Sequence, residues 1–336
     1  MRSTPIYARF RKIRHRIKRA IRRRQARLPW LGAAVVRRRL TQRYVDAFGI
    51  PPRLSPPVSH NERILHRSLF DRDPMLRIVT DKIAVREVIA ARVGPEAVVP
   101  TLGIWGRVED IDWASLPRQF VLKPNHASGT VALVRNAAEH DFAALATKAR
   151  TWLNYDYFDY SLEWGYRDLK RFVIAEPLLT CGGAAPVEAQ VFTFQGRAAL
   201  VRVLCGQVAT AERSSNWFTL DGERLPYVSA VKIGEHDLAR EEIERLVPMA
   251  ERAAAGFRQL RVDFYLTDDG PKIGELTPYH GGGFTQWNDD RFNHLLGRLW
   301  ADRDLLDRVA GATAAEIIAL VGQEPGNKGA GKDRTT

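Results

Sequence analysis

Cysteine is almost absent from this 336-residue sequence. The two cysteines, Cys181 and Cys205, are far apart and belong to no CxxC or Cys/His pattern. This spacing supports neither a disulfide framework nor a zinc site. Free thiols are typical of reducing compartments, so the sequence predicts a cytoplasmic protein.

Long apolar runs are also missing, and no signal peptide is visible. Because a helix needs about 20 apolar residues to cross a bilayer, we expect no transmembrane helix. Hydrophobic residues still make up 45% of the chain, which is ordinary for a globular protein with a buried core. At this length we expect two or three subdomains.

Acidic residues are missing from the first 45 positions, which hold 16 lysines and arginines. Subtracting these 16 from the 51 basic residues leaves 35, against 39 acidic residues, so the remainder has a net charge of −4. The overall excess of +12 therefore lies in the N-terminal segment. Nucleic-acid binding by the folded body is not expected, because the body has no positive excess.

Apolar residues recur every three or four positions in that basic segment, at Ile6, Phe10, Ile13, Ile17 and Ile21. One apolar stripe on a strongly basic helix is typical of helices on an anionic membrane surface. A solvated tail, an RNA-binding arm and a helix docked on a partner share the pattern. With these as alternatives, we expect residues 1–28 to contact the inner face of a membrane peripherally. The proline-rich stretch over residues 49–57 is typical of a linker.

The stretch FVLKPNHASGT, residues 120–130, joins an apolar run to a lysine and a loop of small residues. An ammonium group at the end of a strand can neutralise a phosphate, and the N–H groups of a small-residue loop can bind its oxygens. The alternative is an ordinary strand and turn with a solvated Lys123.

Periodicity predicts the elements around this stretch. We expect a helix over residues 80–94, with Thr80 or Asp81 as its cap and Gly94 as its stop. Further helices are expected over residues 141–153, 237–257, 291–300 and 312–321, and strands over residues 171–179, 187–196 and 197–205.

A second candidate site lies on two strands joined by a turn at Asp268–Gly270. Arg261 and Asp263 share one face of the first strand, and Glu275 and Thr277 share one face of the second. Paired carboxylates beside an arginine suit magnesium together with phosphate. An exposed hairpin with solvated charges is the alternative. Without a metal the carboxylates repel one another, so neutralising Glu275 is expected to leave the fold intact or slightly stabilised.

Five segments occur in the order seen in ATP-grasp proteins: VTDKIAVREVIAARVG, FVLKPNHASG, RFVIAEPLL, VEAQVFTFQG, and RVDFYL with GELTPYHGGGF. Over roughly residues 60–305 the chain resembles the TupA-like branch, which is associated with teichuronopeptide and other cell-surface polysaccharide biosynthesis. The resemblance implies an α+β ATP-grasp fold in which two α/β lobes clamp ATP. It divides the chain into a basic amphipathic segment (1–45), an N-terminal region (46–115), a small lobe with the phosphate loop (116–180), a large lobe with the metal site (181–322) and a flexible tail (323–336).

The resemblance also implies roles for single residues. Lys123 contacts the ATP phosphates, and Arg261 stabilises the phosphate during transfer. The implied nucleotide-binding positions are Lys82, Lys123, Asn125, His126, Ser128, Gly129, Glu176, Pro177, Leu178, Leu179 and Glu188, of which residues 176–179 form the hinge that reads adenine. The implied ligands of one or two Mg²⁺ ions are Asp263, Glu275 and Thr277. Candidates for the acceptor pocket, each with a structural role as the alternative, are His126, Glu163, Trp164 and Tyr166.

Two positions depart from the family pattern. Thr277 stands where many ATP-grasp enzymes have an asparagine, which weakens the case for a second metal ion. Gln190 stands where relatives of this branch tend to have a lysine, so phosphate neutralisation falls to Lys123, Arg261 and magnesium.

The resemblance predicts an ATP- and magnesium-dependent carboxylate–amine ligase that forms an acylphosphate and acts in cell-surface polymer biosynthesis. Its expected substrates are ATP, a carboxylate and an amine, the last two linked to a sugar or polymer. Two alternatives stay open: an ATP-dependent kinase or transferase that modifies a glycan, and a non-catalytic ATP-binding module on membrane or RNA.

Overall fold

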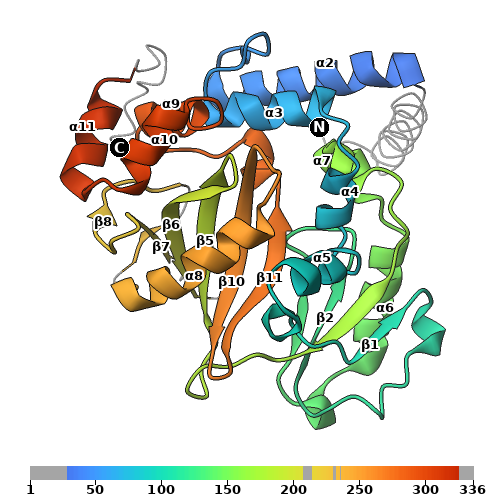
Figure 1. Ribbon diagram of the computed structural model, residues 1–336. Helices are drawn as coiled ribbons and strands as arrows, with labels where there is room; N and C mark the ends of the chain where they lie inside the picture. The colour runs from blue at the N-terminus through green and yellow to red at the C-terminus, as the bar shows by residue number, and fades with distance from the viewer. Residues whose placement is uncertain (1–28, 207–213, 230–231, 235, 325–336) are drawn as a thin grey trace, which may run out of the picture. The chain divides into compact units, whose positions relative to one another are not determined.

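The computed structural model describes residues 29–206, 214–229, 232–234 and 236–324 (Figure 1). The chain divides into two compact units, Met1–Arg53 with Gly329–Thr336, and Leu54–Lys328. The described part of the first unit contains the helix α2 (Pro29–Phe48). The predicted basic helix around residues 6–21 and most of the predicted C-terminal tail lie outside the described residues.

Helices occur along the whole sequence of the second unit, before, between and after its strands. They are α3 (His60–Phe70), α4 (Met75–Thr80), α5 (Val85–Arg92), α6 (Phe142–Leu153), α7 (Tyr157–Ser161), α8 (Arg240–Ala253), α9 (Asp290–Arg298), α10 (Arg303–Ala310) and α11 (Ala314–Gly322). Single 3₁₀ turns are η1 (Pro95–Ala97), η2 (Val108–Asp110), η3 (Ala137–Glu139), η4 (Trp164–Tyr166) and η5 (His280–Gly283).

A four-stranded antiparallel sheet follows the first helices, in the order β1-β4-β2-β3 among the described residues. Its strands are β1 (Gly103–Trp105), β2 (Phe120–Pro124), β3 (Ala132–Val134) and β4 (Val173–Pro177). α6 packs on it through a cluster that includes Phe120, Leu145 and Trp152. Since β1 precedes residue 116, this sheet begins inside the range that we assigned to the N-terminal region. The lobe boundaries stay predictions.

A seven-stranded sheet forms the rest of the described body, in the order β11-β10-β5-β6-β7-β8, with β9 beside β7. The strands are β5 (Val187–Phe194), β6 (Arg197–Cys205), β7 (Ser214–Phe218), β8 (Arg224–Leu225), β9 (Lys232–Ile233), β10 (Gln259–Thr267) and β11 (Gly270–Thr277). The predicted hairpins at Gly196 and at Asp268–Gly270 are confirmed by the pairing of β5 with β6 and of β10 with β11.

Alternation along these strands builds a core on each face of the large sheet. Val191, Val262 and Phe264 face α8, which crosses one side of the sheet in Figure 1. Phe192 and Trp217 face the other way, into a cluster with α9, α10 and α11. This second face carries the polar residues of the site at its β10–β11 edge.

The prediction of a helix over residues 80–94 gives the wrong start for α5 and the right end. Thr80 closes α4, and its hydroxyl donates to the carbonyls of Leu76 and Gly165. The Asp81 carboxylate accepts the N–H of Ile83 and the side-chain amide of Asn125, so residues 81–84 form a turn and α5 begins at Val85.

Transmembrane helices were also considered. Within the described part of the chain, no helix combines the length and apolar character needed to cross a membrane.

Candidate functional site

The predicted strand pair places its polar residues as the sequence requires. Asp263 stands opposite Glu275, and Arg261 stands opposite Thr277. Arg261 holds Asp263 through two hydrogen bonds, Nε to Oδ1 at 2.6 Å and Nη2 to Oδ2 at 2.5 Å. Its Nη2 also lies 3.3 Å from the Thr277 hydroxyl. Three of the predicted residues therefore form one contact group.

An irregularity in the register sets the position of Glu275. Asp263 pairs with Glu275 but the next residue, Phe264, pairs with Ile273, so Gly274 bulges out of β11. A Cβ atom on Gly274 would lie 2.5 Å from the ring of Tyr265. Glycine is therefore required where this ring crosses the bulge.

On the other side of β10, Gln190 lies opposite Asp263. Its amide nitrogen donates to Glu188 at 2.7 Å and approaches Asp263 Oδ2 at 3.4 Å. Gln190 thus connects two carboxylates at the position where we noted the missing lysine. Glu188 joins the Asp263 group through this contact.

Lys82 connects Glu275, a predicted metal ligand, to the predicted phosphate loop. Its Nζ lies 2.7 Å from Glu275 Oε1 and donates to the carbonyl of Ala127 at 2.8 Å. Its backbone N–H donates to the carbonyl of Asn125. Lys82 and Glu275, which are 193 positions apart in the sequence, are therefore direct partners.

Lys123 forms the second lysine–carboxylate pair. It is the last residue but one of β2, with only 8% of its surface exposed, and its Nζ lies 2.6 Å from Glu176 Oε2. Arg86 approaches the other oxygen of Glu176 at 3.8 Å. Glu176 is therefore a buried ion-pair partner, while the remaining hinge residues, Pro177 to Leu179, are half-buried at the end of β4.

The loop after Lys123 has a fixed base and an open tip. Asn125 is fully buried and bonds Asp81, Lys170 and the backbone of Phe172. His126 is buried with one ring nitrogen 3.0 Å from Asn125 and the other 3.0 Å from the Tyr155 carbonyl. Ser128 and Gly129 are exposed, and a Cβ on Gly129 would meet nothing within 4 Å. Only the tip presents accessible backbone.

Charges converge on Glu275 from three sides. Burial raises the pKa of this carboxyl, but the charges of Lys82, Lys123 and Arg261 outweigh burial and lower it overall. For Asp263, burial and the charges of Glu188 and Glu275 raise the pKa to about 7 against the opposing effect of Arg261. The three cations and the carboxylates thus act on one another within one region.

Sequence reasoning missed Tyr265 and His280. Burial, followed by the charges of Glu188, Glu275, Glu176 and Asp263, raises the pKa of the Tyr265 phenol well above its ordinary value. The carboxylates of both lysine pairs, Glu275 with Lys82 and Glu176 with Lys123, therefore act on this phenol. Its position in RVDFYL, two residues after Asp263, is a signal in the sequence, because residues two apart in a strand share a face.

His280 contacts Arg261 directly, with Nδ1 at 2.6 Å from Nη1. It is the first residue of η5, which follows β11 after Pro278 and Tyr279. No periodic pattern predicts this contact, because the histidine lies in a glycine-rich turn.

The four candidates for the acceptor pocket divide into two groups. Burial, followed by the charges of Glu163 and Glu275, raises the pKa of Tyr166 well above its ordinary value. The backbone N–H of Tyr166 also donates to the carbonyl of Glu163. Trp164 packs instead against the core beneath α8 and lies 5.5 Å from the Arg72 guanidinium. His126 is held in the base of the loop. The structure brings together only Glu163 and Tyr166.

The donor set of the strand pair fits a magnesium ion. Asp263 and Glu275 supply hard oxygen ligands from opposed positions, and Mg²⁺ is commonly bound by one or two carboxylates together with phosphate oxygens and water. No group of three or more His, Cys, Asp or Glu side chains suited to a metal occurs in the described residues. Asp263, Glu275 and Thr277 thus stay the predicted magnesium ligands.

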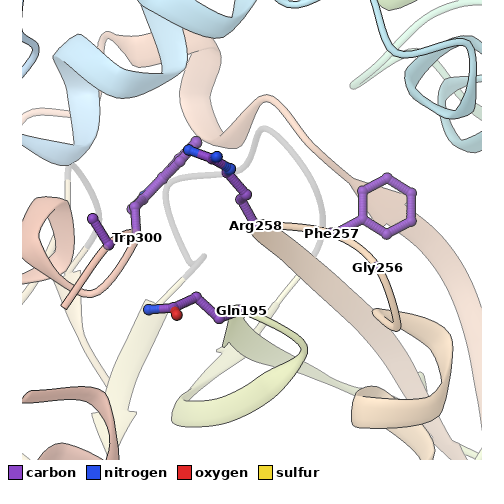
Figure 2. Close-up of a pocket in the computed structure, with 6 residues that line it drawn as sticks. Gln195, Gly256, Phe257, Arg258 and Trp300 are labelled. Carbon is purple, nitrogen blue, oxygen red and sulfur yellow. The ribbon is translucent and has the colours of Figure 1, made fainter. Parts of the chain in front are cut away.

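A separate pocket of about 430 Å³ lies where the β5–β6 turn meets the start of β10 and the end of α9 (Figure 2). Its lining residues are Gln195, Gly256, Phe257, Arg258, Trp300 and Ala301. Gln195 is fixed by hydrogen bonds to the carbonyls of Arg258 and Leu299. None of the predicted site residues lines this pocket, so it is distinct from the strand-pair site.

Comparison with known proteins gave one family match. Residues 62–301 match the family model described as TupA-like ATPgrasp. A search of curated proteins found no match.

Solved structures with a similar chain path include D-alanine–D-alanine ligase from Bacillus anthracis, at TM-score 0.41 and 15% identity over 74% of this chain and 69% of that chain. The complex of that enzyme with ATP gives TM-score 0.38 and 16% identity over 61% of this chain, and only 57% of that chain is spanned. D-cycloserine synthetase DcsG gives TM-score 0.41 and 16% identity over 68% of this chain and 72% of that chain. The family assignment depends on the family model and not on these structures.

Proposed function

The chain belongs to the TupA-like ATP-grasp family, and from this premise we propose that it is an ATP- and Mg²⁺-dependent carboxylate–amine ligase. One observation supports the proposal above all others. Lys82, Lys123 and Arg261 come from three separate segments, and their charges act together on Glu275. Such a convergence of cations on a carboxylate pair suits the triphosphate of ATP with its magnesium ion.

The roles of the side chains follow from their partners. Lys123 and Lys82 end in ion pairs beside the phosphate loop, buried at Lys123 and half-buried at Lys82, where each ammonium group can exchange its carboxylate for a phosphate oxygen. The exposed backbone at Ser128 and Gly129 offers N–H groups to the same phosphates. Arg261 holds its charge beside Asp263, where it can stabilise the negative charge of the phosphate during transfer.

Asp263 and Glu275 would hold the magnesium ion, and Thr277 lies on the same face as Glu275 to bind it or a water molecule. Bound there, magnesium supplies neutralisation of the phosphate oxygens. The reaction that we propose transfers the γ-phosphate of ATP to a substrate carboxylate, and an amine then displaces phosphate from the acylphosphate to leave an amide.

The substrate class in this proposal comes from the family. We propose that the carboxylate and the amine are linked to a sugar or polymer used in cell-surface polysaccharide biosynthesis. Glu163 and Tyr166 are the proposed acceptor-side residues, since their backbones are hydrogen-bonded and the charge of Glu275 acts on the Tyr166 phenol. The proposed location is cytoplasmic, where ATP is available and the two free cysteines stay reduced.

Turnover by the purified full chain tests this function. With ATP, Mg²⁺, a uronic acid and an amino acid, we expect phosphate release that requires both the carboxylate and the amine. Phosphate release that needs an acceptor hydroxyl and no amine would instead identify a kinase. No magnesium-dependent ATP turnover across a panel of such acceptors would support the non-catalytic alternative.

A further inference from the structure

His280 is buried against the guanidinium of Arg261. Only 3% of its surface is exposed, and its Nδ1 lies 2.6 Å from Arg261 Nη1. Arginine has N–H donors and no acceptor, and it stays protonated in proteins. Arg261 must therefore donate this hydrogen bond, and Nδ1 of His280 must accept it.

That direction fixes the state of the imidazole. With Nδ1 as an acceptor, the ring is neutral and its proton is on Nε2. Burial, and then the charges of Arg261, His60 and Arg202, lower the pKa of His280 well below its ordinary value. A neutral ring is therefore consistent with every charged neighbour that acts on it.

Neighbouring rings hold the imidazole in place. Phe192 packs edge-to-face at a centroid distance of 5.0 Å, with His60 at 5.8 Å and Trp287 at 6.1 Å. These contacts come from β5, α3 and the segment before α9. The ring cannot turn away from Arg261 without displacing them.

The glycines after His280 set its backbone. Gly281 and Gly282 have φ angles of 57° and 62°, a conformation that other residues rarely adopt. A Cβ on Gly283 would lie 2.7 Å from the backbone oxygen of Asn61. The sequence HGGG therefore provides the tight turn that brings an imidazole against the start of β10.

The contacts of Arg261 differ in what they do to its charge. Asp263 accepts two hydrogen bonds from Arg261 and also cancels its charge. His280 accepts one and leaves the charge uncancelled. If Asp263 binds a metal ion, the contact with the neutral His280 can keep the guanidinium in place with its charge available to phosphate.

We propose that His280 is a positioning residue for Arg261, which it holds as a neutral hydrogen-bond acceptor. The inference rests on the role of Arg261 in the proposed function.

Two substitutions at His280 and one control test the proposal. His280→Phe keeps a planar ring and removes the acceptor, while His280→Gln restores an acceptor oxygen. We expect kcat to fall roughly 100-fold in His280→Phe, because a small displacement of a charged group has that effect, and to recover largely in His280→Gln. His60→Phe is the control, since His60 lies in the same buried ring cluster but has no hydrogen bond to Arg261. It should lose stability with little loss of kcat.

A positioning role is refuted if His280→Phe keeps its kcat, or if His60→Phe loses as much kcat as His280→Phe. A second readout needs no turnover. In ¹⁵N NMR spectra at low temperature, the Arg261 Nη1–H signal, which belongs to the nitrogen that contacts His280, is identified by its loss in Arg261→Lys. It should shift and exchange faster with water in His280→Phe but not in His60→Phe. An unchanged signal in His280→Phe would contradict the positioning role of His280, whether or not the protein is a ligase. Absence of turnover in the wild type would contradict only the proposed ligase function.

Discussion

At the scale of single residues, three carboxylates of the candidate site each have a cation beside them. Asp263 is paired with Arg261, Glu275 with Lys82, and Glu176 with Lys123. Removing one member of a buried pair costs about 3–5 kcal/mol, because the other charge is left uncompensated. A test of binding must therefore distinguish the effect of a substitution on ligand affinity from its effect on the free energy of unfolding.

Lys123 illustrates how this can be done. We expect Lys123→Met to weaken ATP binding while adenosine binding is kept, because the role that we propose for its ammonium group is to bind phosphate. The variant leaves Glu176 unpaired, so its free energy of unfolding should fall as well. Isothermal titration calorimetry with both ligands gives the two affinities.

The matched control is the double variant Lys123→Met with Glu176→Gln, which removes both charges of the pair. Its stability should recover toward the wild type, while ATP binding stays weak. Equal losses of ATP and adenosine affinity in this double variant would show that Lys123 is structural.

Glu275→Gln should nearly abolish turnover, because it removes one of two carboxylates that can hold magnesium. Repulsion between carboxylates predicts that the substitution leaves the ligand-free protein intact or stabilised. The structure reverses this expectation, since Glu275 is paired with Lys82 at 2.7 Å. We expect a lower midpoint of thermal unfolding without ligand and a smaller gain from ATP with Mg²⁺ than in the wild type. A variant with wild-type turnover and magnesium dependence would exclude Glu275 as a metal ligand.

The contacts within the strand pair of the site were predictable, and the contacts with distant segments were not. Arg261 and Asp263 are two apart, and the period of a strand places them on one face. Lys82 and Glu275 are joined only by the tertiary fold, and no local pattern connects them. His280 was missed for the same reason, because its contact depends on where a glycine turn returns the chain.

At the scale of elements, the strands of the site were predicted well because each has a clear turn beside it. The turns at Gly196 and at Asp268–Gly270 fix the two hairpins. The start of α5 was predicted wrongly because Thr80 and Asp81 both have the chemistry of a helix cap. Which bonds such side chains make depends on partners elsewhere, here Gly165 and Asn125. The helix α10 between the two predicted C-terminal helices was not predicted at all.

The helix α9 provides a test of pH dependence at this scale. His294 lies 3.4 Å from Asp290, one turn earlier, and this hydrogen-bonded partner raises the pKa of His294 above its ordinary 6.5. Glu62 and Glu324 act in the same direction, against partial burial. Because the folded pKa is the higher one, the pair stabilises fully below pH 6.5, and this contribution is lost as the pH rises through the folded pKa.

Substitution of His294 by Gln isolates this contribution. The free energy of unfolding of the wild type should exceed that of His294→Gln by more at about pH 5.5 than at about pH 8.5. The change is expected to stay below about 1 kcal/mol, since Asp290 is partly exposed. Urea unfolding at the two pH values measures it, and a difference that grows with pH would contradict the pairing.

At the scale of the whole molecule, the family match covers residues 62–301 and leaves the basic N-terminal segment outside it. Residues 1–28 contain 12 lysines and arginines and no acidic residue. The ligase chemistry that we propose needs none of these charges. A segment of this composition is better explained by an anionic partner, and its apolar stripe favours a membrane surface over a free polyanion.

We therefore predict that the full chain binds vesicles that contain anionic lipid and that deletion of residues 1–28 abolishes this binding. Affinity should fall as salt rises, because screening weakens the attraction between basic side chains and the charged surface. Deletion of residues 325–336 is the control, since this end also carries basic residues but no apolar stripe, and it should leave vesicle binding unchanged. ATP affinity should be the same in both deletions, because the cations proposed to bind phosphate lie between residues 82 and 261.

Vesicle co-sedimentation at low and high salt measures the membrane binding. Equal binding to neutral and anionic vesicles would contradict the predicted role of electrostatic attraction. Tighter binding to RNA than to vesicles would show that the N-terminal segment binds a nucleic acid instead of a membrane.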